Sequence, residues 1–72
     1  MEKILTMTSQ TLAIKAKRLL EKQGIYVRIV RPSPQKTPNG CSFGLQTDER
    51  FFPYILLSLK QENIPFGEMI DV

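Results

Sequence analysis

The stretch IYVRIVRPSPQKTPNGCSFGLQT, residues 25–47, decides the fold because it predicts two strands joined by a long turn. Its first part, residues 25–31, is dominated by β-branched residues in an alternating pattern, which is typical of a strand. Three prolines then stop this strand, since proline cannot donate a hydrogen bond to a strand ladder, and Asn39-Gly40 signals a turn. Residues 41–47 alternate again, so a second strand is expected to follow the turn.

Upstream of this stretch the sequence predicts a strand followed by a helix. Residues 3–7 are expected to form the strand, and the hydroxyl of Thr8 or Ser9 can cap the helix by accepting a backbone N–H. Apolar residues then recur at helical spacing over residues 9–23, with mostly charged residues opposite them. Gly24 stands where a helix ends in a left-handed residue.

Downstream of the stretch the sequence predicts a second helix and a last strand. Asp48 is expected to cap this helix, which has to begin close to Pro53 because proline is tolerated only in the first turn. Asn63 is expected to end the helix, and Pro65 prevents its return. A short strand over residues 67–72 then completes the chain.

The order strand, helix, strand, strand, helix, strand predicts a ferredoxin-like α+β fold for a single domain, residues 1–72. Each helix joins two strands, and such crossovers are right-handed. The economical arrangement is a four-stranded antiparallel sheet in the order 4-1-3-2 with both helices on one face. In this βαββαβ topology the proline loop lies at the same sheet edge as the N-terminus of the first helix.

The composition is that of a soluble globular domain, with 42% hydrophobic and 24% charged residues in 72. Apolar runs are too short to span a bilayer and the N-terminus lacks the apolar core of a signal peptide, so we expect a cytoplasmic protein without a membrane partner. A single cysteine cannot form an internal disulfide, and a reducing compartment keeps it a free thiol. Since the chain also has no histidine, we expect neither a metal site nor a cofactor.

The net charge of +3 is modest, and solubility explains it most simply. Basic residues cluster on the predicted first helix, where such a run usually forms a solvated face. RNA binding would need aromatic residues interleaved with the basic ones, and the chain has only two tyrosines. The sequence therefore argues against a nucleic-acid partner. The clustered residues are Lys15, Lys17, Arg18 and Lys22.

Cys41 opens the second strand of the hairpin, and the predicted topology brings it near the start of the first helix. A helix N-terminus presents unpaired N–H groups and a partial positive charge, which favour a thiolate over a thiol. Such a thiolate could capture sulfur or selenium as a persulfide-type adduct and hand it on. Alternatively, Cys41 shares an inward face with Phe43 and Leu45 and is only a small packing residue. The candidate anion-binding residues are Ser9, Gln10, Thr11, Arg31 and Lys36, and the candidate loop-shaping residues are Pro32, Pro34 and Gly40.

The segment PSPQKTPNGC, residues 32–41, resembles a motif of a small prokaryotic family described as selenium/sulfur carrier-like proteins. Pro32, Pro34 and Cys41 fall at the matching offsets of a P-x-P-R-x-x-S-x-x-C-G pattern, and Ser9 looks like the family's serine at the start of the first helix. The resemblance covers nearly the whole chain, although the motif itself is short. It implies the predicted fold and a carrier role for Cys41.

The motif also differs from the family pattern at several positions. Gln35 stands where the family usually has arginine, and Lys36 follows one position later. Pro38 stands where serine is common, and Ser42 replaces the glycine after the cysteine. The missing arginine weakens an anion site, and the missing glycine restricts approach to the sulfur.

Two classes of function therefore remain open. The first is a thiol carrier that works with a sulfur or selenium donor or acceptor protein, without turnover of its own, because no second acid-base group is evident. The second is a regulatory or interaction module that forms a homodimer or binds a small ligand through the open face of the sheet. That face would carry Tyr26, Arg28, Val30, Gly44 and Gln46.

Overall fold

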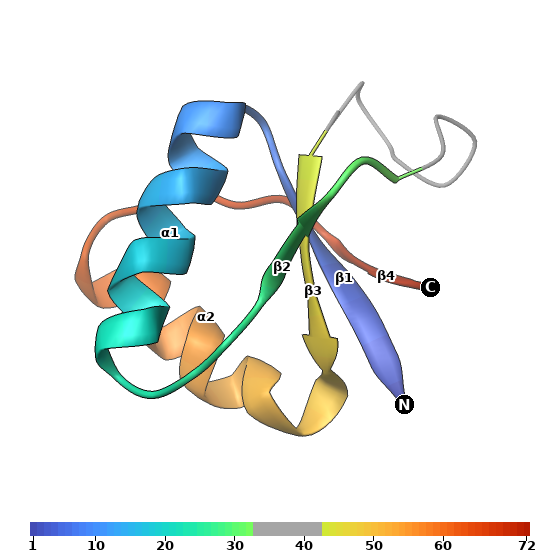
Figure 1. Ribbon diagram of the computed structural model, residues 1–72. Helices are drawn as coiled ribbons and strands as arrows, with labels where there is room; N and C mark the ends of the chain where they lie inside the picture. The colour runs from blue at the N-terminus through green and yellow to red at the C-terminus, as the bar shows by residue number, and fades with distance from the viewer. Residues whose placement is uncertain (33–42) are drawn as a thin grey trace.

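A computed structural model describes residues 1–32 and 43–72 of the protein (Figure 1). Both helices lie on the same side of the sheet, and no helix of the described residues lies on its other face (Figure 1). The elements are β1 (Glu2–Met7), α1 (Gln10–Lys22), β2 (Arg28–Val30), β3 (Phe43–Asp48), the 3-10 turn η2 (Glu49–Phe51), α2 (Phe52–Gln61) and β4 (Met69–Asp71). Four of the predicted site residues, and the predicted turn, lie outside the described residues: Pro34, Lys36, Asn39-Gly40 and Cys41.

The four strands form one sheet in the order β2-β3-β1-β4, and every neighbouring pair is antiparallel. This arrangement confirms the predicted ferredoxin-like βαββαβ fold and its 4-1-3-2 strand order. The register is set by β1, which pairs with β3 along its whole length and with β4 at Lys3, Ile4 and Leu5. The two middle strands therefore hold the sheet together, and β2 and β4 are its short edge strands.

The hydrophobic core fills the space between the sheet and the two helices. Alternate residues of β1 and β3 point into it, and the apolar stripes of both helices cover them. Side chains that are at most 1% exposed include Leu5, Met7, Leu20, Leu45, Phe52, Ile55 and Leu59. Burial of each such side chain contributes about 1.5–3 kcal/mol of transfer free energy, so this one layer supplies most of the drive to fold.

The strand β2 is shorter than predicted, because it begins at Arg28 and not at residue 25. Ile25 donates its N–H to the carbonyl of Leu20 at 2.9 Å, so it belongs to the end of α1 and not to the sheet. The carbonyl of Tyr26 accepts from the hydroxyl of Thr47 at 3.3 Å, a side-chain bond in place of a ladder bond. Gly24 has φ +80°, which confirms the predicted left-handed end of the first helix.

The start of the second helix also differs from the prediction. Asp48 does not cap α2; its carboxylate accepts the N–H of Arg50 at 3.0 Å and caps the turn η2. This backbone hydrogen bond lowers the pKa of Asp48. The helix α2 then begins at Phe52 with Pro53 in its first turn, as predicted. It ends at Gln61, two residues before the predicted Asn63, which follows in a left-handed conformation with φ 56°.

The last strand is shorter than predicted as well, since β4 spans only Met69–Asp71 of the expected 67–72. Gly67 donates its N–H to the carbonyl of Thr6 at 2.7 Å, and the carbonyl of Glu68 accepts the N–H of Thr6 at 2.9 Å. These bonds tie the segment to β1 before the regular ladder begins. In the part of the chain that the structure describes, no helix is both long and apolar enough to cross a membrane.

Candidate functional site

The first turn of α1 is held by Ser9, which precedes the helix in extended backbone. Its hydroxyl accepts the N–H of Leu12 at 3.1 Å, and its carbonyl accepts the N–H of Ala13 at 3.1 Å. Ser9 is therefore the N-cap, which decides between the two capping residues that the sequence left open. Within residues 1–32 and 43–72 the N–H groups of Gln10 and Thr11 find no acceptor, and both residues are exposed. These two donors and the helix dipole remain available to an anion.

Replacing Ser9 by alanine is expected to lower the free energy of unfolding by about 1 kcal/mol, because Leu12 then loses its acceptor. Urea unfolding followed by circular dichroism measures this loss. Thr8→Ala is the matched control, since Thr8 is exposed and outside the helix, and its effect should stay within about 0.5 kcal/mol. Equal losses for both variants would contradict the assignment of Ser9 as the cap.

Phe43 is the residue at which the candidate site is organised. It is the first residue of β3 and follows Cys41 by two positions in the sequence. Its Cα pairs with that of Met7, the last residue of β1, and Ser9 follows Met7 by two positions. On its other side, the guanidinium of Arg31 lies over the Phe43 ring, 5.2 Å from the centroid. The ends of β1 and β2 and the starts of β3 and α1 therefore meet at one edge of the sheet, the edge that is formed by strand ends and not by an edge strand (Figure 1).

Arg31 supplies positive charge at this edge. It is exposed, and among the described residues no carboxylate lies within ion-pair distance of it. The cation–π contact with Phe43 holds its guanidinium in place without neutralising its charge. Pro32 follows directly and is half-buried. An anion at this edge would thus meet a fixed cation on one side and the helix dipole on the other.

The structure describes five of the predicted site residues and leaves four undescribed. The described ones come from the cap and first turn of α1 and from the two residues after β2, where Arg31 lies over the ring of Phe43 at the start of β3. They are Ser9, Gln10, Thr11, Arg31 and Pro32. Sequence reasoning missed Phe43, which it assigned to the core alone. An aromatic residue two positions after the lone cysteine was the available signal.

The open face of the sheet is polar at one end and apolar at the other. Arg28 and Gln46 sit opposite each other in the register, and both contact the carboxylate of Glu2: the Arg28 guanidinium at 3.6 Å and the Gln46 amide through a short hydrogen bond. Val30 and Gly44 pair beyond them. The predicted face residues of β2 and β3 are thus confirmed, but their polar groups are satisfied within the chain. Tyr26 precedes β2 and is exposed.

Potential metal-binding side chains do not gather in the described part of the chain, where no group of three or more histidine, cysteine, aspartate or glutamate residues comes together. The described residues of the candidate site offer backbone N–H donors and one guanidinium.

A protein-family model described as "Putative Se/S carrier protein-like" matches residues 2–71 of the chain. The match spans every strand and helix of the fold, including the segment that carries Cys41. No curated protein and no solved structure matches the chain. The motif resemblance noted at residues 32–41 is thus part of a similarity that extends over nearly the full length.

Proposed function

We propose that this chain, which belongs to the Se/S carrier protein-like family, carries sulfur or selenium on Cys41 between partner proteins in the cytoplasm. The family supports a carrier role in general, and the role of this particular thiol is our proposal. The observation that carries it is the convergence at one sheet edge of the α1 N-terminus, the Arg31 guanidinium and Phe43, two positions after Cys41.

The transfer needs no oxidant or reductant beyond its partners. The Cys41 thiolate attacks the outer sulfur of a donor persulfide, R–S–SH. A new S–S bond forms on Cys41, the S–S bond of the donor breaks, and the donor leaves as the thiolate R–S⁻. An acceptor thiolate then attacks the outer sulfur of the Cys41 adduct and regenerates the Cys41 thiolate. Selenium follows the same course when the outer atom of the donor is selenium.

The surroundings of the site suit each part of this cycle. Cys41 is the attacking thiolate in the first step and the leaving thiolate in the second, and a lowered pKa favours both states. The N–H groups of Gln10 and Thr11, which have no acceptor among the described residues, and the charge of Arg31 would stabilise an anionic sulfur in either state. In this cycle the protein acts as an accessory to its donor and acceptor partners.

Mass spectrometry of the protein purified from cells without reductant is the direct test. We expect a fraction of the chains to carry the mass of one extra sulfur or selenium atom, and peptide mapping should locate it on Cys41. The Cys41→Ser variant should lack the adduct, because a hydroxyl does not form a persulfide. Loading with inorganic polysulfide in vitro provides a second measurement on the same variants. A native protein that acquires no adduct from cells or from polysulfide would contradict the carrier function.

A further inference from the structure

The outer face of α1 carries a charge that the described part of the chain does not neutralise. The helix holds four basic side chains and one acidic one, so its net charge equals the +3 of the whole chain. Lys15, Arg18 and Lys22 are exposed, and in the described ranges, 1–32 and 43–72, none of them has an ion-pair partner. The acidic side chains that do pair lie instead around β1, η2 and β4.

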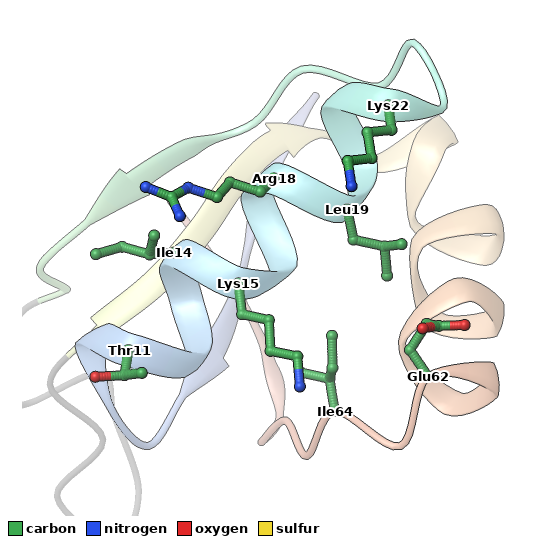
Figure 2. A pocket seen from close by; sticks show the side chains of 8 residues that line it. All are labelled: Thr11, Ile14, Lys15, Arg18, Leu19, Lys22, Glu62 and Ile64. Carbon is green, nitrogen blue, oxygen red and sulfur yellow. The ribbon is translucent and has the colours of Figure 1, made fainter.

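The same face of α1 borders an open groove of about 420 Å³. Its far wall is the segment after α2, which contributes Glu62 and Ile64. Figure 2 shows Lys15, Leu19 and Lys22 extending from α1 toward this segment. Leu19 is half-buried and Ile64 is only 3% exposed, so the floor is apolar, whereas the lysines stand at the rim.

We propose that this groove is the docking surface for an acidic amphipathic segment of a partner protein. The inference rests on the proposed carrier function for the identity of that partner, which would be the sulfur or selenium donor or acceptor. The binding itself follows from the groove alone: aliphatic side chains of the segment fill the apolar floor, and its carboxylates meet the basic rim.

The spacing of the rim favours a helical segment. Lys15, Arg18 and Lys22 follow one another at i, i+3 and i+7, which places them along one face of α1 over about 10 Å. Figure 2 shows Lys15 extending toward Ile64, whereas Arg18 and Ile14 extend to the other side of α1. A partner helix that lies along α1 would therefore meet cations on both of its sides. Ile14, 36% exposed beside this row, adds an apolar contact that a helix with leucines between its acidic residues would cover.

The apolar floor argues for a protein segment and against a nucleic acid. Phosphates would use only the basic rim and would leave the floor uncovered. Single-stranded RNA gains its affinity by stacking on aromatic side chains, and the described residues that line the groove are aliphatic, hydroxyl and charged, with no aromatic ring among them. A protein segment that carries both aliphatic and acidic side chains matches the apolar floor and the basic rim of the groove.

The groove also connects to the carrier site. Thr11 lines one end of it and belongs to the first turn of α1, where the free N–H groups of the candidate site lie. A partner segment in the groove would thus end beside the sheet edge at which β3 begins. Docking there would hold the partner beside the first turn of α1 and the start of β3.

The test uses fluorescence anisotropy with a labelled helical peptide of about 14 residues that carries glutamates at i, i+3 and i+7 with leucines between them. We expect salt-sensitive binding to the full chain. The K15E/R18E double variant should bind roughly tenfold more weakly, because attraction is replaced by repulsion at two rim positions. The matched control R50E/K60E makes the same charge change outside the groove and should stay within about twofold. Ile14→Ser should weaken binding severalfold at unchanged charge.

Each result decides the matter. If K15E/R18E and R50E/K60E weaken peptide binding equally, the attraction is nonspecific and the proposal is overturned. A native chain that does not bind the peptide would also overturn it. Binding of polyuridine RNA or of phosphatidylglycerol vesicles through Lys15 and Arg18, without binding of the peptide, would overturn it as well. Cys41→Ser keeps the groove intact, so normal peptide binding with failed sulfur loading would count against the carrier function alone. Normal loading with failed peptide binding would count against the groove alone.

Discussion

Iodoacetamide is expected to label Cys41 at a lower pH than it labels free cysteine, which has a pKa of about 8.5. In the proposed carrier site the α1 N-terminus and the Arg31 guanidinium would both favour the thiolate, so we expect them to lower the pKa of Cys41. The measurement is the labelling rate as a function of pH, with glutathione as the reference thiol. Its midpoint reports the pKa independently of how freely the reagent reaches the sulfur.

The labelling rates of Cys41 and glutathione provide a second test. A thiol whose pKa is about one pH unit lower holds roughly eight times more thiolate at neutral pH, while each thiolate is about threefold less nucleophilic. Cys41 should therefore react roughly threefold faster than glutathione at neutral pH and more slowly at high pH. A buried or merely crowded thiol would be slower at both ends, so the crossing of the two curves separates the carrier from the packing role.

Charge reversal at Arg31 tests the cause of the shift. Arg31→Glu should move the labelling midpoint of Cys41 to higher pH, because a carboxylate replaces the cation beside Phe43. Arg28→Glu is the matched control: it makes the same charge change on β2, but Arg28 faces Glu2 on the open side of the sheet. A midpoint at or above that of glutathione, unmoved by Arg31→Glu, would remove the physical basis of the carrier function.

The fold was predictable from the sequence because its signals are local and mutually consistent. Alternation, caps and prolines placed six elements in order, and the rules of chain crossover left one economical topology. The errors arose where tertiary contacts override local signals. Ile25 has the β-branched character of a strand residue but bonds to Leu20 at the end of α1, and Asp48 has the character of a helix cap but caps a 3-10 turn.

The candidate site was predictable only in outline. The predicted strand order showed which strand ends meet at one edge of the sheet. It therefore predicted that Ser9, Arg31 and the start of β3 lie near one another. It could not show that Arg31 stacks on Phe43, because that contact depends on side-chain conformations across two strands. The groove was beyond sequence reasoning for a similar reason. Its wall is formed by Ile64 from the other end of the chain, so the basic run on α1 looked like a solvated face.

Gly44→Val is expected to lower the free energy of unfolding by about 2–3 kcal/mol. Gly44 is buried at the second position of β3, where a Cβ would overlap Cγ2 of Ile4 and lie 3.3 Å from the carbonyl oxygen of Leu5. Neither of these neighbours can move easily to make room for a Cβ. The carbonyl belongs to the central strand β1, and Ile4 is β-branched and only 6% exposed, so its side chain has few other rotamers.

Gly24→Ala gives a control in which steric overlap plays no part. Apart from Gly24 and its two chain neighbours, no atom of the described residues lies within 4 Å of a Cβ built at Gly24, and its φ of +80° makes alanine unfavourable there by only about 1 kcal/mol. Gly44→Val should therefore cost at least twice as much as Gly24→Ala in urea unfolding. Since domains of this size are stable by only about 5–15 kcal/mol, the valine variant should also lose a large share of its folded population on heating.

A double-mutant cycle with Ile4 isolates the contact itself. Ile4→Ala alone should destabilise the protein by about 2–4 kcal/mol, because it leaves a cavity beside Gly44. In the Ile4→Ala/Gly44→Val protein the new valine enters that cavity. The double variant should therefore lose at least about 1 kcal/mol less stability than the sum of the two single losses. Simple additivity would show that the valine is accommodated without displacing Ile4. In that case the close approach of β1 and β3 would not be what requires glycine at position 44.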